Sequence, residues 1–349
     1  MDRQQFKKKR IMKPRKRRIL FFILIPILFL SLSGVGYGTY LYKQAKDTLS
    51  DSYKKIDGRD KSDKRTDMVN PEDDHVSILV MGVDDSDKRD YGTAIRTDAL
   101  LLATLNKEDK SIKLVSIPRD TYTYIPEVGY DDKINHAHVF GGEKATIETV
   151  EELFDIPVDY YVKVNFYAFI DLVDALGGIT VDVPYEFYEQ DSKDKSDAIH
   201  LYPGEQTLDG EEALALARTR KLDSDVERGK RQQEILKAIA TKALSVDALT
   251  KYDELLSAIG DNMTTDLTFN NITSFWKYGT SGRLNIETLT LEGEDLYLNN
   301  SDGSRKYVYN LDPIALDETI ATLKDHLEIS NPTISNEDEE DEIEDETGI

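Results

Sequence analysis

The sequence contains no cysteine, which excludes disulfide scaffolds, zinc–thiolate sites and cysteine nucleophiles. It also lacks an H-E-x-x-H zinc motif, a G-x-S-x-G nucleophile elbow and a P-loop. Basic residues are scarce: 44 Lys and Arg stand against 67 Asp and Glu, a net charge of -23. Because nucleic-acid binding needs clustered positive charge, we expect no nucleic acid among the partners. With 39% hydrophobic residues, the chain can still bury a core.

Positive charge is concentrated at the N-terminus, where residues 1–18 carry ten Lys and Arg. Residues 19–42 then contain no charged side chain, and this stretch is long enough to cross a bilayer as a helix. A cleaved signal peptide, the alternative, has a shorter apolar region of about 7–15 residues. By the positive-inside rule, we predict a cytoplasmic segment over 1–18 and a transmembrane signal anchor over 19–42. The protein is then a single-pass type II protein of the cell membrane, with everything after the anchor extracellular.

Three further regions follow the anchor. Residues 43–75 are polar and densely charged, which predicts a stalk. Residues 337–346 carry nine acids and no base, so we predict a disordered acidic tail over 329–349. The folded extracellular domain is expected over 76–328.

Strand and helix patterns alternate along this domain. Apolar runs and period-two segments predict strands at 77–83, 99–105, 112–117, 159–166, 179–183, 285–291 and 305–310. Helical spacing predicts helices at 141–154, 168–176, 208–220, 229–244, 248–260, 270–278 and 312–327. Asp209 is the expected N-cap of the helix in the 208–220 segment. Such alternation predicts an α/β fold, a layered α/β/α domain with a central mixed sheet.

Arginine carries the functional signal. Eleven arginines follow residue 43, and none lies between 120 and 217. Six of them stand at the ends of predicted elements: Arg96, Arg119, Arg218, Arg220, Arg228 and Arg231. A guanidinium is planar and always charged, and it matches phosphate oxygens in a bidentate way, so several together would suit a pyrophosphate. The alternative is that each arginine pairs with the plentiful surface carboxylates.

Acidic residues are interleaved with these arginines. Asp84 and Asp85 follow the first predicted strand, and Asp98 begins the second. Carboxylates beside a phosphate site are the oxygen ligands that Mg²⁺ prefers, although isolated acids in so acidic a chain are more often surface residues. His136 and His138 have no third ligand at motif spacing, so we interpret them as structural.

The order of these motifs resembles the LytR–CpsA–Psr family, and within it the teichoic acid transferase branch. The matching segments are SILVMGVDD (77–85), RTDALLL (96–102), SIPRDTY (116–122), KINHAHVFGG (133–142), DYYVKV (159–164), LVDALGGITVDV (172–183), LDGEEALALARTR (208–220) and DVERGKRQQ (225–233). The resemblance implies a Mg²⁺-dependent phosphotransferase of cell wall assembly. It would move an anionic glycopolymer, such as wall teichoic acid, from a polyprenyl-pyrophosphate carrier to peptidoglycan in a Gram-positive type of envelope.

The resemblance also implies roles for residues. Pyrophosphate binding falls to Arg119, Arg218, Arg220, Arg228 and Arg231, assisted by Gln232 or Gln233. The metal ligands would be Asp84 and Asp98, and the catalytic group would be Asp98, Arg96 and Arg119, with Arg96 orienting Asp98 or contacting phosphate. The lipid would occupy an apolar tunnel between the sheet and the helices, for which the sequence indicates no residues.

In the implied reaction a peptidoglycan hydroxyl attacks the phosphorus nearest the glycopolymer, and polyprenyl phosphate leaves. Metal and arginines would neutralise the developing charge. Asp98 and Asp225 are both candidates for the base that takes the hydroxyl proton. Two other functions remain open from the sequence: a membrane-anchored pyrophosphate hydrolase, and a non-catalytic wall-binding regulator with the same fold.

Overall fold

The computed structural model describes residues 43, 46–47, 52–83, 95–221, 225–244, 263–282, 284–299 and 303–329. The chain divides into two compact units, Met1–Thr48 and Leu49–Ile349. Of the first unit only residues 43, 46 and 47 are described, and they are helical. No helix in the described part of the chain has the length and apolar character to cross a membrane. The expected anchor at 19–42 and the acidic tail from residue 330 onward lie outside the described residues.

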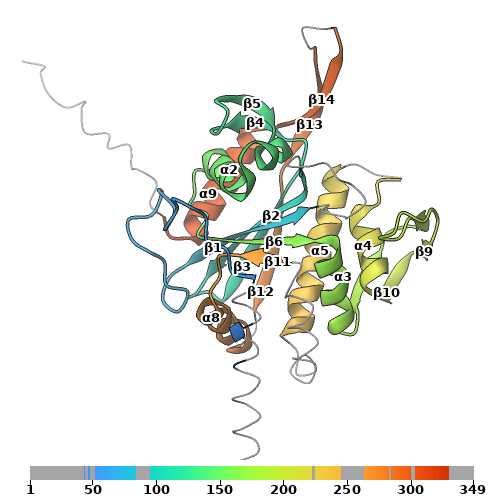
Figure 1. The fold of residues 1–349 in the computed structure, drawn as a ribbon, viewed down its shortest axis with the longest axis horizontal. Helices are drawn as coiled ribbons and strands as arrows, with labels where there is room; N and C mark the ends of the chain where they lie inside the picture. Colours follow the sequence, from blue (N-terminus) through green and yellow to red (C-terminus); the bar gives the residue numbers. More distant parts are fainter. Residues whose placement is uncertain are drawn as a thin grey trace, which may run out of the picture. The chain divides into compact units, whose positions relative to one another are not determined.

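The second unit is built on a six-stranded mixed sheet (Figure 1). Its strand order is β11 (Met263–Thr265), β6 (Tyr160–Asn165), β1 (Val76–Val83), β2 (Thr97–Asn106), β3 (Ser111–Ile117) and β12 (Asn285–Thr290). The β1–β6 and β3–β12 pairs are parallel, and the other three are antiparallel. This confirms the predicted central mixed sheet.

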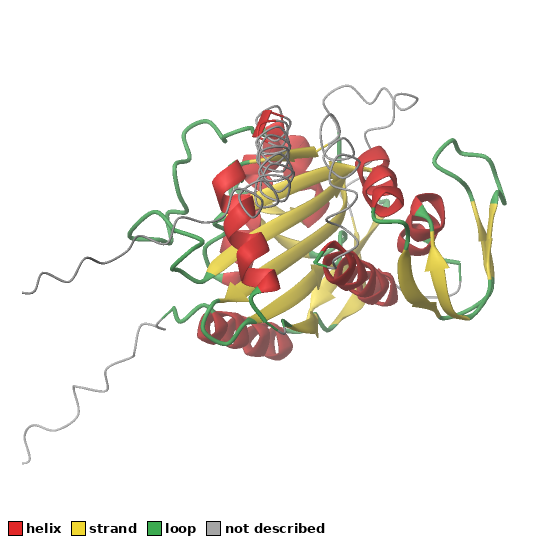
Figure 2. Ribbon diagram, turned by 90° about the horizontal axis from the view of Figure 1, so that it is seen from below, coloured by secondary structure: helices red, strands yellow, loops and turns green. Residues whose placement is uncertain are grey.

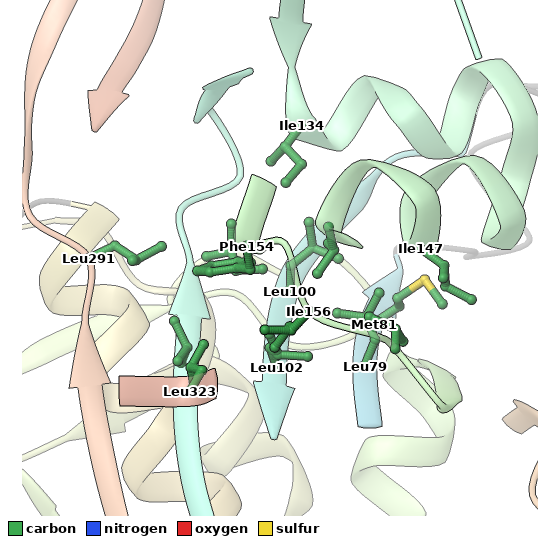
Figure 3. Close-up of a cluster of buried hydrophobic side chains, with 14 of the residues drawn as sticks. Leu79, Met81, Leu100, Leu102, Ile134, Ile147, Phe154, Ile156, Leu291 and Leu323 are labelled. Carbon is green, nitrogen blue, oxygen red and sulfur yellow. The ribbon is translucent and has the colours of Figure 1, made fainter. Parts of the chain in front are cut away.

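One face of the sheet packs against α2 (Ala137–Phe154) and α9 (Pro313–His326). Alternate residues of the central strands point to this side, among them Leu79 and Met81 of β1 and Leu100 and Leu102 of β2, and all four are fully buried. They meet side chains from the helices and loops, such as Phe154 (Figure 3). The period of two along each strand places the intervening residues on the opposite face.

That opposite face carries α3 (Phe166–Ala175), α4 (Gly210–Arg218), α5 (Asp225–Ala243) and α8 (Phe269–Thr280). Ala103, Leu105 and Leu114 of the sheet are buried there against Leu236 of α5 and Phe275 of α8. Figure 2 shows the sheet with helices packed on both sides. The predicted three-layer α/β/α arrangement is therefore confirmed.

Short two-stranded sheets surround this core, and most of their strands escape prediction from sequence. The pairs are β4 (Tyr122–Ile125) with β5 (Tyr130–Lys133), β7 (Ile179–Val183) with β10 (Gly204–Leu208), β8 (Phe187–Glu189) with β9 (Ile199–Leu201), and β13 (Gly293–Asn299) with β14 (Arg305–Leu311). Only β7 and β14 among them were expected. All the missed strands among these except β13 have only three to five residues, and such strands show too few alternations to stand out from loops.

The beginning of α4 follows from local sequence, whereas that of α2 does not. The side chain of Asp209 caps α4 by accepting from the Glu212 amide at 2.9 Å, and the Glu212 carboxylate accepts from the Asp209 amide at 3.0 Å. Helix α2 begins at Ala137, four residues before the predicted start at 141. Gly141 and Gly142 interrupt its helical geometry, and Gly142 has φ 63°, a conformation that favours glycine.

The prediction of a separate stalk over 43–75 needs correction for its described part. Residues 52–75 pack on the domain and do not stand apart from it. Arg59 forms a bidentate pair with Glu151 of α2, with Nη2–Oε1 at 2.8 Å, and Arg65 pairs with Asp159 at 2.7 Å. Tyr53 bridges to Thr265 at the end of the sheet. The predicted boundary at residue 76 is therefore too late, because a charge-rich segment can bind a folded surface through paired charges as well as extend into solvent.

Arg231 of α5 joins two helices. Its side chain is buried, with 8% of the residue exposed. The guanidinium donates to the carbonyl oxygens of Leu216 at 3.2 Å and Thr219 at 2.5 Å. These carbonyls lie at the C-terminal end of α4, where backbone acceptors lack partners within the helix. Arg231 thereby fixes the segment that carries Arg218 and Arg220.

We predict that Arg231→Met destabilises the protein by about 1–3 kcal/mol, because it leaves buried carbonyl groups without a donor. Urea unfolding of the purified chain measures this change. The control is Arg220→Met, an exposed position where the change should stay within about 0.5 kcal/mol. Equal stability of the two variants would contradict the structural role of Arg231.

His326 at the end of α9 is a buried, hydrogen-bonded histidine. Its Nδ1 lies 2.8 Å from Thr104 Oγ1 and its Nε2 lies 2.8 Å from Ser111 Oγ. Burial, together with the charges of Lys113 and His75, lowers the pKa of His326 to about 4. The folded protein therefore keeps this ring neutral at a pH where the unfolded chain, with its ordinary pKa of 6.5, takes up a proton.

His326 should consequently lower the free energy of unfolding as the pH falls from 6.5 towards 4. His326→Gln keeps hydrogen-bonding groups but cannot titrate, so the loss of stability over this interval should become smaller. Urea unfolding at several pH values measures the slope. A slope identical to that of the parent would show that other groups determine the acid sensitivity.

Candidate functional site

A cavity of about 400 Å³ lies between the sheet and helices α3, α4 and α5. Its strand-side wall comes from the central strands and its helix-side wall from all three helices. Most of the lining is apolar: Val80, Leu101, Val162, Val164, Phe166, Phe169, Leu172, Leu214, Ile235, Leu236, Ile239 and Met263. The sequence indicated no residues for the expected apolar tunnel, and these lining residues are the candidates for it.

One end of the same cavity is polar. Its charged and amide side chains are Asp98, Arg119, Asn165, Arg218, Arg220, Arg228 and Gln232. They come from the start of β2, the loop after β3, the end of β6, the end of α4 and the start of α5. The strand register places the start of β2 beside the end of β3, because Leu100 is paired with Ile117, and beside the end of β6, because Gly82 of β1 is paired with both Ala99 and Val164. The end of α4 and the start of α5 meet these strand ends at the cavity. The structure thus gathers six of the predicted site residues at one edge of the sheet.

Arg119 is held by carboxylates on two sides. Its Nη1 lies 2.6 Å from Asp98 Oδ1, and its Nε lies 3.6 Å from Asp120 Oδ2. The Nε is buried and makes no hydrogen bond. Asp120 in turn accepts a hydrogen bond from Lys133 Nζ at 2.8 Å. The guanidinium is therefore oriented before any ligand arrives, while one of its donors still lacks an acceptor.

Asp120 stays ionised because of its neighbours. Burial alone would raise its pKa, but the hydrogen bond from Lys133 and the positive charges of Lys133, Arg119 and Arg220 outweigh this effect and lower the pKa. Sequence reasoning missed both Asp120 and Lys133. Both residues lie in motifs that the sequence analysis named: Asp120 follows Arg119 in SIPRDTY, and Lys133 is the first residue of KINHAHVFGG.

The other arginines approach the cavity from the helices. The Arg218 guanidinium lies 4.8 Å from the centre of the Phe166 ring, which itself lines the cavity. Arg228 is buried at the start of α5, with 5% exposed. The next residue, Gly229, allows this close approach to the sheet, because a Cβ there would lie 2.6 Å from Ser116 Oγ.

Successive positions of α5 serve different neighbours. Arg228 and Gln232 are four residues apart, so they share a helix face and both line the cavity. Gln233 is buried on the sheet side, where its Nε2 donates to the carbonyls of Leu114 at 3.2 Å and Leu289 at 2.8 Å. Of the two glutamines left open by the sequence, Gln232 is the one at the cavity.

Some predicted site residues lie elsewhere. Arg231 does not line this cavity in the described structure; it binds the carbonyls at the end of α4. Arg96 is exposed and is likewise absent from the described lining. Asp84, Asp85 and the side chain of Asp225 lie outside the described residues.

Of the two predicted metal ligands, Asp98 is the one that lies within the described residues. Its carboxylate lines the polar end of the cavity beside four arginines. Within the described ranges no group of three or more His, Asp or Glu side chains could hold a metal ion. Mg²⁺, however, commonly uses one or two carboxylates and completes its shell with water and phosphate oxygens. The residues present are therefore compatible with Mg²⁺ that binds together with a phosphate ligand.

Both histidines of the HAH segment make structural hydrogen bonds, as the sequence indicates. His136 Nδ1 lies 2.8 Å from Asp132 Oδ2, and His138 Nδ1 lies 2.9 Å from the Ile95 carbonyl oxygen. Burial lowers the pKa of His138 below its ordinary value. Neither ring lines the cavity described above.

Comparison with known proteins identifies relatives over most of the chain. The model of the LytR_cpsA_psr family matches residues 39–325. TagU of Bacillus subtilis (strain 168), a polyisoprenyl-teichoic acid--peptidoglycan teichoic acid transferase, is 37% identical over 318 residues that cover 90% of this chain and 98% of TagU.

Two solved structures of TagT have the same fold. TagT bound to LIIa-WTA matches with a TM-score of 0.67 at 36% identity, and TagT with bound octaprenyl pyrophosphate lipid matches with a TM-score of 0.63 at 34% identity. Each comparison covers 79% of this chain and 100% of the TagT chain. With the motifs, the mixed sheet and the arginine-lined cavity in agreement, this chain is a member of the LytR–CpsA–Psr family.

Proposed function

We propose that this protein transfers an anionic glycopolymer, such as wall teichoic acid, from a polyprenyl-pyrophosphate carrier to peptidoglycan. One observation carries the proposal: a single cavity joins a cluster of arginines to a long apolar lining. A polyprenyl pyrophosphate is divided in the same way: its head group carries at least two negative charges, and its tail is a hydrocarbon. The names and bound ligands of the relatives TagU and TagT support this assignment.

The two parts of the ligand are bound by different forces. The prenyl chain gains free energy by leaving water for the apolar walls, at about 25 cal/mol per Å² buried. The pyrophosphate oxygens accept charge-assisted hydrogen bonds from the guanidinium groups. Arg119 contributes an oriented fork with one unsatisfied Nε, and Arg218, Arg220 and Arg228 surround the same space. The scissile phosphorus is thereby held at the polar end.

The reaction follows from this position. The oxygen of a peptidoglycan hydroxyl attacks the phosphorus that bears the glycopolymer, and the bond from this phosphorus to the oxygen of polyprenyl phosphate breaks. The hydroxyl proton passes to a carboxylate at the polar end, where Asp98 is the acid among the described lining residues. Arginine forks stabilise the negative charge on the equatorial and leaving oxygens. Mg²⁺ held by Asp98 and Asp84 would add further charge neutralisation at those oxygens.

We predict that lysine cannot replace the arginines at the cavity. Arg119→Lys, Arg218→Lys and Arg220→Lys keep the charge but remove the paired hydrogen bonds. Each lost charge-assisted hydrogen bond is worth about 1.5–3 kcal/mol, so the transfer rate from a lipid-linked donor should fall roughly ten- to a hundred-fold. Arg305→Lys is the control, since Arg305 is exposed on β14 with its guanidinium 4.8 Å from the Tyr297 ring. If all four variants behave alike, the arginines do not hold the pyrophosphate as proposed.

We also predict that Mg²⁺ dependence runs through Asp98. Asp98→Asn preserves the volume of the side chain but removes its charge, so the transfer rate should drop and the Mg²⁺ concentration for half-maximal rate should rise. Asp131→Asn, at an exposed position of β5, should leave both quantities unchanged. A Mg²⁺ titration curve of Asp98→Asn that overlays the parent curve would place the metal ligands elsewhere.

For the location of this chemistry, we propose that residues 19–42 anchor the protein in the cell membrane with the catalytic domain outside. The ten basic residues before this uncharged stretch support the orientation. A reporter enzyme that works only outside the cytoplasm, fused after Ile349, should be active. A fused reporter that works only in the cytoplasm should be inactive, and the reverse pattern would reject the type II topology.

A further inference from the structure

The β8–β9 hairpin and the residue after it carry three neighbouring aromatic rings at the surface, of which the first two are stacked and the third is tilted against the second. The ring centres of Tyr188 and His200 are 3.9 Å apart with planes at 13°, and those of His200 and Tyr202 are 4.3 Å apart at 47°. Tyr188 is 45% exposed and Tyr202 is 56% exposed. We call these three residues the aromatic ladder. Tyr188 and Tyr202 both contact His200 and both remain largely open to solvent.

The aromatic ladder is positioned by strand pairing and by a hydrogen bond, although its rings contribute little to the core. Tyr188 and His200 are direct partners in the antiparallel pairing of the two strands. His200 Nε2 lies 2.9 Å from Glu186 Oε1, which fixes the middle ring from its edge. The neighbouring Phe187 points the other way and is buried in the cluster formed with β7 and α4. The hairpin is thus anchored by Phe187, and the exposed rings are available for contacts outside the protein.

The aromatic ladder lies beside the segment that leaves the polar end of the cavity. Lys221, the residue after Arg220, donates a hydrogen bond from Nζ to the Tyr188 carbonyl oxygen. Figure 1 shows β9 next to α4, on the side of α4 that faces away from the central sheet. One lysine side chain therefore bridges the aromatic ladder to the backbone beside a cavity arginine.

The chemistry of this surface fits a saccharide. Sugar rings present apolar C–H faces that stack on exposed aromatic rings, while their hydroxyl groups donate hydrogen bonds to carboxylates. Five carboxylates lie close along the hairpin sequence, at Glu186, Glu189, Asp191, Asp194 and Asp197, against only Lys193 and Lys195 within the same stretch. This excess of negative charge disfavours the phosphate-rich donor glycopolymer more than the acceptor glycan, whose charge is limited to the carboxylates of its muramic acid residues. A glycan without a high density of phosphate is suited to it.

We propose that the aromatic ladder binds the glycan strand of peptidoglycan and presents its hydroxyl groups to the polar end of the cavity. This inference rests on the proposed function, because it assigns a binding surface to the acceptor of that reaction. The donor then occupies the cavity, and the acceptor approaches from the hairpin side of α4. The arginines attract the pyrophosphate of the donor, and the exposed rings of the aromatic ladder contact the sugar rings of the acceptor.

The test uses the full-length chain in detergent and glycan strands freed of teichoic acid and stem peptides. Tyr202→Ala should weaken binding of these strands and raise the acceptor KM by about tenfold, with kcat unchanged. Tyr202→Phe keeps the ring and should bind like the parent, which separates loss of the ring from misfolding. Tyr297→Ala is the matched control, at a tyrosine that is 52% exposed on another hairpin.

Two results would overturn the inference: glycan affinity and acceptor KM of Tyr202→Ala equal to those of Tyr297→Ala, or a loss of affinity for the polyprenyl-pyrophosphate donor in place of the glycan. Failure of the proposed function has a different signature. In that case the parent neither binds the lipid-linked donor nor transfers its glycopolymer, whatever its affinity for glycan strands.

Discussion

The structure depends on holding several guanidinium groups together at the end of an apolar cavity. Like charges repel, and burial disfavours each of them, so the cluster needs fixed partners before a ligand binds. The partners are the Asp98 and Asp120 carboxylates around Arg119, reinforced by Lys133, and the Phe166 ring beneath Arg218. In the proposed function, a pyrophosphate would replace the remaining repulsion with attraction.

Helix α5 shows how one element supports this arrangement in three directions. Residues 231, 232 and 233 point about 100° apart around the helix axis. Arg231 reaches the carbonyls of α4, Gln232 lines the cavity, and Gln233 bonds to the backbone of the sheet. Gly229 brings the helix close to β3, so that Arg228 enters the cavity. The position of the arginines thus follows from the packing of α5 between α4 and the sheet.

The central strands, most of the helices and six of the residues at the polar end could be predicted from sequence, because each has a strong local pattern or motif. Arg231 shows the limit of motif reasoning: it has the same residue type as Arg228 and stands three positions away, yet its partners are set by the neighbouring helix. The apolar lining could not be predicted for another reason. The sequence pattern around a residue such as Leu172 is the same whether its side chain faces a core or a cavity. The packing of residues 52–75 depends on the distant acids Glu151 and Asp159, which no local pattern reveals.

The most direct measurement of the central claim is photo-cross-linking with a polyprenyl pyrophosphate that carries a diazirine on its hydrocarbon tail. The account predicts that labelled peptides, identified by mass spectrometry, come from β6, α3 and α5, which line the apolar part of the cavity. Excess unlabelled polyprenyl pyrophosphate should abolish this labelling. Specific labelling confined to α8 or α9, with none in those three elements, would contradict the assignment of the cavity to the lipid.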